Sequence, residues 1–206
     1  GRRSQTLFDR YGQTIETRSE AYDAAGTQVW LTTRTVYDSL GRVTLSTDRY
    51  VAPADTPLGG GTSPLFYATL TIYDSLGRSV GSQRVEGASV TIAGTPSTLE
   101  ASVASIGALL YESQTIYDSR GRVARSISPT GELTEYVYDS RDRQIATIGT
   151  PLAPEDVGLG DRYPGQLVRL RSETEFDSYG QVALQRTGVI QVEQADGSLI
   201  AIDRTD

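Results

Sequence analysis

The sequence predicts an all-β fold built from consecutive antiparallel β-hairpins, and three observations support that prediction. A six-residue motif of the form Tyr/Phe-Asp-x-x-Gly-Arg occurs in three close copies and four looser ones along the 206 residues. The chemistry of each copy suits a tight turn. The flanking residues are β-branched and aromatic types that are typical of strands. Repetition of this kind indicates one small structural unit that is stacked along the chain.

We call each copy a corner and number the corners in chain order. Three corners are close to ideal, and they are Tyr37-Asp38-Ser39-Leu40-Gly41-Arg42, Tyr73-Asp74-Ser75-Leu76-Gly77-Arg78 and Tyr117-Asp118-Ser119-Arg120-Gly121-Arg122. Four are looser, and they are Phe8-Asp9-Arg10-Tyr11-Gly12-Gln13, Tyr22-Asp23-Ala24-Ala25-Gly26-Thr27, Tyr138-Asp139-Ser140-Arg141-Asp142-Arg143 and Phe176-Asp177-Ser178-Tyr179-Gly180-Gln181.

Each corner is predicted to reverse the chain. The Asp carboxylate can accept hydrogen bonds from main-chain N–H groups a few residues on, which opens a tight turn. The Gly three positions later supplies the positive φ that closes a type I turn and its bulge. Asp142 stands at this Gly position in the sixth corner, and Asp tolerates the left-handed region better than most residues. Strands are expected beside the corners, for example over residues 35–37, 43–47, 71–73, 115–117 and 136–138.

Three long insertions separate the corners, at about residues 51–66, 87–111 and 148–165. The first contains Pro53, Pro57 and Pro64 and is predicted to be a loop. The third is also predicted to be a loop, with one possible helical turn at Glu155-Asp156 after Pro154. At most one or two short helices are therefore expected in the whole chain.

The second insertion is expected to begin with a strand over residues 89–93. Leu99, Val103, Ile106 and Leu110 then recur with roughly helical spacing, so a short helix is one prediction for this stretch. The alternative is another hairpin that turns at Ile106-Gly107. Near the end of the chain, Asp-Gly predicts a last hairpin, with strands at 189–194 and 199–203 around a turn at 195–198.

Composition excludes several classes of function. Cys, His and Lys are absent, which removes disulfides, thiolate metal sites, the commonest general base and Schiff-base chemistry. The net charge of −7 has acids scattered among arginines, so no basic stripe for nucleic acid and no patch for an anionic membrane is expected. No apolar run approaches the roughly 20 residues that span a bilayer. We expect no enzyme activity, no cofactor and no metal site.

The motif side chains are interpreted as structural. A catalytic carboxylate is needed once, whereas this Asp occurs in every corner. The arginines after Gly are expected to pair with a nearby Asp or Glu or to stack on a Tyr of the next repeat, and they are Arg42, Arg78, Arg122 and Arg143. The aromatic residues before Asp are expected to form a packing spine, although a sugar-binding ladder is the alternative. The single Trp30 is expected in the core.

The chain resembles the YD-repeat family, also called Rhs repeats, which includes bacterial Rhs proteins, the C component of Tc toxins and animal teneurins. The resemblance rests on the Tyr/Phe-Asp-x-x-Gly-Arg corners, which cover nearly the whole chain. It implies hairpins wound into one continuous spiralling sheet that forms a shell or solenoid segment. Residues 1–206 are accordingly expected to be a single segment of a longer array. The self-cleaving aspartates and the toxic domain of some relatives are not carried over.

The expected function is that of a non-catalytic structural segment in a large secreted or cell-surface bacterial protein. Its hairpins would stack into an extended fibre-like or shell-like extracellular assembly for surface structure or adhesion. One alternative is the wall of a toxin-enclosing cocoon, and another is a carbohydrate-binding module that uses exposed Tyr faces. The expected partners are neighbouring repeat segments or identical chains at the sheet edges, with cell-surface glycans or proteins as further possibilities.

Overall fold

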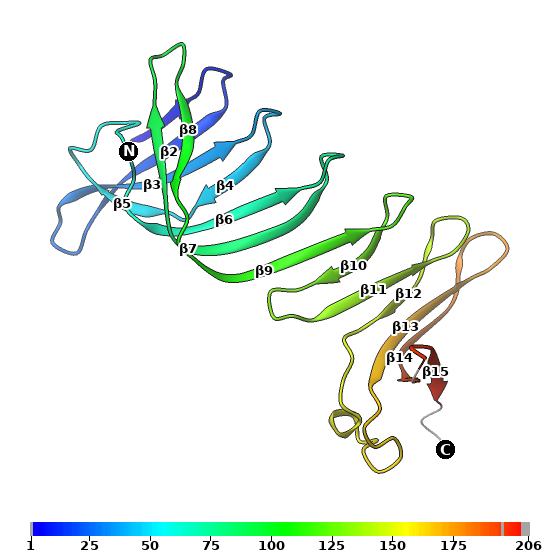
Figure 1. Ribbon diagram of the computed structural model, residues 1–206. Coiled ribbons are helices and arrows are strands. Elements are labelled where there is room, and N and C mark those ends of the chain that lie inside the picture. The colour runs from blue at the N-terminus through cyan, green and yellow to red at the C-terminus, as the bar shows by residue number, and fades with distance from the viewer. Residues whose placement is uncertain (1, 195, 203–206) are drawn as a thin grey trace. The chain divides into compact units, whose positions relative to one another are not determined.

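The computed structural model describes residues 2–194 and 196–202, and the regular secondary structure of these residues is antiparallel β-sheet apart from one short helical turn. The prediction of consecutive antiparallel hairpins is confirmed. The described helical structure is one short 3₁₀ turn, η1 (Pro154–Val157), at the place where the sequence predicts a helical turn. The chain divides into two compact units, Gly1–Glu112 and Ser113–Asp206, and each unit is described by itself (Figure 1).

The first unit is an antiparallel sheet in which the order of strands follows the chain. Its path runs β1-β2-β3-β4-β6-β7, with β5 paired to β3 and β8 paired to β7. The bounds are β1 Ser4–Phe8, β2 Thr14–Tyr22, β3 Gln28–Tyr37, β4 Val43–Thr47, β5 Tyr50–Pro53, β6 Phe66–Tyr73, β7 Ser79–Ala93 and β8 Glu100–Ser105. Because adjacent strands are antiparallel, the first, third and fourth corners lie on one border of this sheet. The second corner lies on the opposite border.

The second unit repeats the same simple topology. Its path is β9-β10-β11-β12-β13-β14-β15, again in chain order and antiparallel. The bounds are β9 Ala108–Tyr117, of which residues 113–117 belong to this unit, β10 Val123–Ile127, β11 Leu133–Tyr138, β12 Gln144–Ile148, β13 Val168–Phe176, β14 Val182–Glu193 and β15 Leu199–Ile202. The fifth, sixth and seventh corners therefore share one border of this unit.

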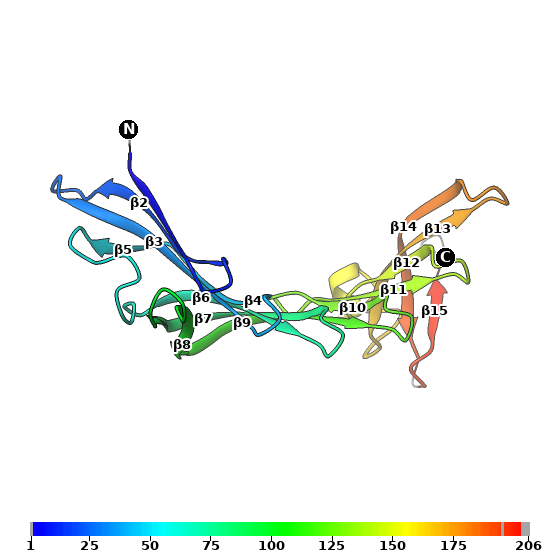
Figure 2. The same cartoon turned by 90° about the horizontal axis from the view of Figure 1, so that it is seen from above.

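Two of the insertions form a second layer on the first unit. Beyond Ala88, β7 leaves β6 and pairs with β8 in a hairpin that rises from the sheet, as Figures 1 and 2 show. Ala101 of this hairpin packs against the buried cluster formed by Val36, Leu45, Ala68, Val85, Ala88 and Val90. The first insertion, predicted as loop, contributes β5, which pairs with β3. The core of this unit therefore lies between the sheet and its own insertions.

The helix that was one prediction for the second insertion is wrong. Val103 lies in β8, Leu110 lies in β9 and Ile106 lies between the two strands. All three are exposed, so their helical spacing does not mark a buried face. The alternative, a hairpin that turns at Ile106-Gly107, is also wrong, because the hairpin of this insertion turns between Ala93 and Glu100, where β7 pairs with β8, and β8 does not pair with β9. The strand expected over 89–93 is the second half of β7.

The third insertion covers the core of the second unit. Val168, Ile190 and Val192 are almost fully buried, and Leu152, Val157, Leu159 and Tyr163 of the insertion pack against them. The strand expected at 189–194 is the second half of the long β14, and its hairpin partner is β15. Residues 195 and 203 of the expected last hairpin lie outside the described residues. Within the described part, no helix has the length and apolar character needed to cross a membrane.

Candidate functional site: the corners and the joints between them

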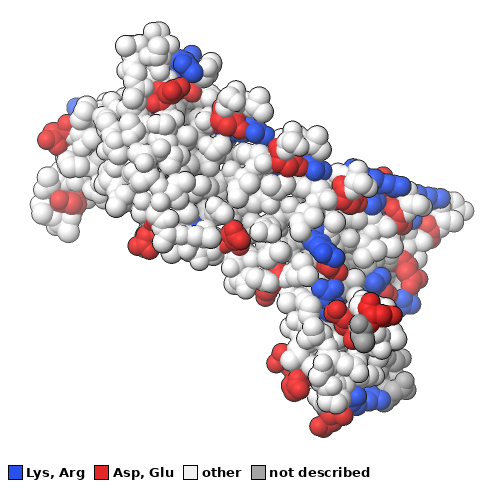
Figure 3. Space-filling model, in the orientation of Figure 1, with Lys and Arg blue, Asp and Glu red and all other residues white. Residues whose placement is uncertain are grey.

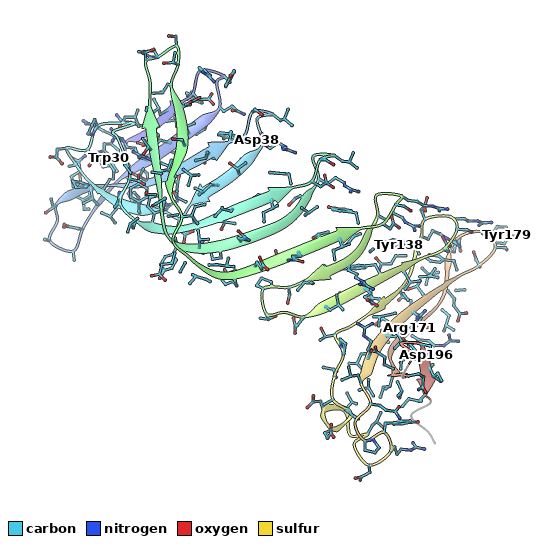
Figure 4. The ribbon with its side chains drawn as sticks, viewed as in Figure 1. Trp30, Asp38, Tyr138, Arg171, Tyr179 and Asp196 are labelled. Carbon is cyan, nitrogen blue, oxygen red and sulfur yellow. The ribbon has the colours of Figure 1, made fainter. Side chains whose placement is uncertain are left out.

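The third corner shows the geometry of the repeated turn. The Asp38 Oδ1 atom accepts hydrogen bonds from the main-chain N–H of Leu40 at 2.9 Å and of Arg42 at 3.0 Å. The main-chain N–H of Gly41 donates to the Asp38 carbonyl oxygen at 3.0 Å, and Gly41 has a φ of 79°. A residue with a Cβ is strained at such a φ, which explains the Gly of the motif. Figure 4 shows Asp38 in its turn between β3 and β4.

All seven corners share this arrangement. In each one, the Asp Oδ1 atom accepts from the N–H groups two and four residues further on; the seven residues are Asp9, Asp23, Asp38, Asp74, Asp118, Asp139 and Asp177. The residue three positions after the Asp has positive φ in every copy; these residues are Gly12, Gly26, Gly41, Gly77, Gly121, Asp142 and Gly180. The Asp side chain therefore serves as a cap for the turn.

Four corners add an ion pair between the Asp and the Arg four residues later. Arg42, Arg78, Arg122 and Arg143 each lie within 2.6–2.7 Å of the Oδ2 atom of their own corner's Asp. The pKa values of the partner carboxyls Asp38, Asp74, Asp118 and Asp139 are lowered, most of all by the hydrogen bond from the main-chain N–H of that Arg. Opposite charges consequently lie side by side at the corners of each unit (Figure 3).

Successive corners on one border are connected by a recurring set of contacts that we call a joint. In the joint between the third and fourth corners, the Arg42 guanidinium lies 4.3 Å from the centroid of the Tyr73 ring. The Tyr73 hydroxyl donates to the Val43 carbonyl oxygen at 3.0 Å. Arg42 therefore binds its own Asp and also holds the aromatic residue of the next corner.

The second unit contains the same joint between its fifth and sixth corners. The Arg122 guanidinium lies 4.4 Å from the centroid of the Tyr138 ring, and the Tyr138 hydroxyl donates to the Val123 carbonyl at 2.9 Å. Figure 4 shows Tyr138 near the turn at the end of β11. Asp142 reinforces this joint, because its carboxylate pairs with Arg122 at 2.6 Å and with Arg120 at 3.0 Å. This explains why a residue other than Gly occupies a position with a φ of 62°.

The joint between the sixth and seventh corners lacks part of this set. Arg143 lies 4.2 Å from the ring centroid of Phe176, which has no hydroxyl to donate. The Arg143 Nη1 atom is buried and has no hydrogen-bond partner. At the equivalent place in the preceding joint, Nη1 of Arg122 meets Asp142, whereas the seventh corner has Gly180 there.

Four of the repeated aromatic side chains, Tyr37, Tyr73, Tyr138 and Phe176, are engaged in these contacts rather than presented as free platforms. Tyr37, Tyr73 and Tyr138 are partly buried, and each hydroxyl donates to a main-chain carbonyl beside the preceding corner on that border. Phe8, which the sequence places in the spine, is instead 52% exposed. Tyr22 lies on the opposite border and is 65% exposed.

Sequence reasoning missed a buried ion pair in the first unit. The side chains of Arg34 in β3 and Glu16 in β2 are each 2% exposed, and Arg34 Nε donates to Glu16 Oε2 at 2.9 Å. The other guanidinium nitrogens donate to the carbonyl oxygens of Gly60, Gly61 and Val90. The pair therefore fastens the first insertion and β7 to the sheet. The inward position of two charged residues is not visible from local sequence.

Arg18 and Trp30 fix the same insertion a few residues earlier. Arg18 lies 4.5 Å from the Trp30 ring centroid and donates to the Thr56 carbonyl oxygen at 2.7 Å. The Trp30 indole N–H donates to the Ala54 carbonyl oxygen at 3.1 Å. Trp30 is 6% exposed, so it belongs to the core as predicted. Among the described residues, no group of three or more metal-ligating side chains is placed to hold a metal ion.

The RHS Repeat family model matches residues 117–152, which hold the fifth and sixth corners and the complete joint between them. This segment is similar to an RHS repeat. The match confirms for these residues the resemblance to the YD-repeat family that the motif indicates, and the other corners repeat the same hydrogen-bonded turn.

No curated protein matches the chain. Similar solved structures include the crystal structure of TcdB2-TccC3, with 18% identity over 98% of this chain and 12% of that chain, at a TM-score of 0.33. A second is the Photorhabdus luminescens Tc holotoxin pore, with 14% identity over 89% of this chain and 11% of that chain, at a TM-score of 0.29. The chain thus spans only 11–12% of the length of these solved chains.

Proposed function

We propose that the chain is a non-catalytic structural segment whose hairpins form part of the wall of a larger extracellular or cell-surface assembly. The assembly would be shell-like or fibre-like. The observation that carries this proposal is the joint, in which Arg42 and Tyr73, or Arg122 and Tyr138, connect one corner to the next. A motif used in this way provides a unit that can be repeated along a border.

The engagement of the motif side chains supports a structural role over catalysis. In every corner the Asp carboxylate already accepts two main-chain hydrogen bonds, and in four corners it also pairs with Arg. A general acid or base must be free to exchange a proton with a substrate. The RHS repeat at residues 117–152 is consistent with the same role.

The partners we propose are neighbouring repeat segments that pair with the outer strands. Among the described strands, β1 ends the path in the first unit and β15 ends it in the second. An outer strand presents main-chain donors and acceptors that readily pair with another strand. Such pairing would lengthen each sheet without any new motif.

The mass of the purified chain in solution tests this proposal. We expect size-exclusion chromatography with light scattering to show association that weakens over a dilution of about a hundredfold. Thr6→Lys in β1 together with Ile200→Lys in β15 should abolish it, because Lys at an outer strand opposes edge pairing. Leu40→Lys, at an exposed corner tip, is the matched control and should leave it intact. A wild-type chain that is monomeric at every concentration would contradict the proposal. So would an equal effect of the double edge variant and the Leu40→Lys control. Fractionation of producing cells tests the extracellular location.

A further inference from the structure

The first joint of the first unit differs from the others in its cation. In three joints, a guanidinium lies between the Asp Oδ2 atom of its own corner and the aromatic ring of the next, and these pairs are Arg42 with Tyr73, Arg122 with Tyr138 and Arg143 with Phe176. The N–O distances are 2.6–2.7 Å, and the guanidinium carbon lies 4.2–4.4 Å from the ring centroid. This geometry combines an ion pair with a cation–π contact.

The first corner has Gln13 where those corners have Arg. The Gln13 amide donates to the Gly41 carbonyl oxygen at 3.1 Å, and the Tyr37 hydroxyl donates to the Thr14 carbonyl at 3.0 Å, so the rest of the joint is in place. Asp9 uses Oδ1 for the main-chain N–H groups of its turn. Among the described residues, no cation pairs with Asp9 Oδ2 and none lies over the Tyr37 ring.

A pocket opens at this place. Its lining includes Asp9, Gln13, Ile15, Tyr37 and Asp38 from the sheet and Glu100 from β8, which forms the wall opposite the corner. The main-chain N–H of Arg10 donates to the Leu99 carbonyl oxygen at 3.0 Å, which fastens that wall to the corner. The pocket therefore combines the two recognition elements of a joint with access from solvent.

The charges around the pocket leave one carboxylate without a counter-ion. Asp38 pairs with Arg42, and Glu100 pairs with Arg10 at 3.3 Å. Asp9 is the remaining acid of the lining. Burial and then the negative charge of Asp9 raise the pKa of Tyr37, as expected where a carboxylate lies close to that side chain. The pocket is thus matched to a single positive charge that is able to stack on an aromatic ring.

We propose that this pocket binds the guanidinium group of an arginine side chain from another polypeptide. The guanidinium would donate to Asp9 Oδ2 and lie over the Tyr37 ring, as Arg42 does with Asp38 and Tyr73. Guanidinium is favoured over ammonium because it is planar, stacks on rings and offers several donors in a fixed geometry. This inference stands on the comparison of joints within the chain and does not depend on the proposed function.

The test is an NMR titration of the purified chain with argininamide, and with a capped Gly-Gly-Arg-Gly-Gly peptide, at constant ionic strength. Methylammonium chloride and sodium chloride serve as cation controls. We expect argininamide and the peptide to shift resonances around Asp9 and Tyr37, with effects from methylammonium that are weaker by about tenfold or more. Tighter binding of the peptide than of argininamide assigns the arginine to a polypeptide, and the reverse order overturns that part of the proposal.

Two variants and a matched control make the test specific. Asp9→Asn keeps the Oδ1 acceptor of the turn but removes the charge, and it should weaken binding by about tenfold or more. Gln13→Arg supplies the cation from within the chain, so it should abolish binding and raise the melting temperature. Asp177→Asn changes the seventh corner, where Gln181 also replaces Arg, and it should leave binding unchanged. Equal responses to all cations, or undiminished binding by Gln13→Arg, would overturn the proposal.

Discussion

Phe176→Tyr should stabilise the second unit, because it supplies the hydroxyl that its joint lacks. In the other joints, the Tyr hydroxyl donates to the main-chain carbonyl of the residue that is paired with the aromatic residue of the preceding corner. Tyr73 donates to Val43, which is paired with Tyr37. Tyr138 donates to Val123, which is paired with Tyr117. The equivalent acceptor for residue 176 is the carbonyl of Gln144, which faces Tyr138. The new hydroxyl therefore has a defined partner.

The expected gain follows from the value of one hydrogen bond. A neutral hydrogen bond contributes about 0.5–1.5 kcal/mol net to the free energy of unfolding. The ring already lies under Arg143, so no further side-chain ordering is needed. For a unit of about 100 residues, each kcal/mol raises the melting temperature by roughly 4–8 °C. Tyr138→Phe removes the same hydroxyl from the intact joint and should destabilise by a similar or larger amount.

Hydrogen exchange followed by mass spectrometry measures this effect within the unit concerned. Because the chain divides into two units, the stability of the second unit is measured locally rather than from one unfolding transition of the whole chain. The quantity to follow is amide hydrogen exchange in β12 and β13. We expect slower exchange there in Phe176→Tyr and unchanged exchange in β2 and β3. The reasoning fails if Phe176→Tyr does not slow amide exchange in β12 and β13 and Tyr138→Phe does not destabilise the unit. In that case the hydroxyl does not stabilise the joint.

Three further predictions concern other contacts. Gly180→Asp should place a carboxylate beside the unpaired Nη1 atom of Arg143. The control is Gly180→Ala, which has the same strain at a φ of 83° but no ion pair. We expect the second unit to melt at a higher temperature in Gly180→Asp than in Gly180→Ala, and equal melting temperatures would contradict this. Glu16→Gln or Arg34→Met should each lower the free energy of unfolding by about 3–5 kcal/mol, because each leaves the other residue's buried charge without an opposite charge, as urea titration would show. The lowered pKa values of Asp38, Asp74, Asp118 and Asp139 mean that their contribution to stability is present above the ordinary carboxyl pKa of about 3.9 and is lost as the pH falls below it. Acid titrations of single Asp→Asn variants should therefore show a shallower loss of stability than the wild type, and an unchanged slope would refute the assignment.

The corners could be predicted from the sequence because their chemistry is local. Asp38 and Arg42 are four residues apart, and the turn that they close contains all of its own hydrogen-bond partners. The sequence also predicted that the corner arginines pair with Asp and stack on an aromatic ring of the next repeat. The partner in the ring contact is 31 residues away for Arg42, 16 for Arg122 and 33 for Arg143, and only the fold brings these residues together.

The second insertion shows why pattern reasoning failed elsewhere. Leu99, Val103, Ile106 and Leu110 have a spacing that suits one face of a helix, yet the last three are exposed, in β8, in β9 or in the segment between them. The hairpin of β7 and β8 is stabilised instead by Val90 and Ala101, which pack against a cluster supplied by distant strands. Spacing cannot reveal which side of an element another part of the chain will cover.

The amino-acid sequence alone determined where the chain reverses at the corners, because an Asp cap and a residue with positive φ act within a few residues. The tertiary structure alone decided which corners share a border, where Arg34 and Glu16 are buried, and which joints hold a complete set of contacts. Those features depend on strand order and on how insertions fold back over the sheet. They join residues far apart in the chain, whose contact is set by the free energy of the whole fold rather than by local chemistry.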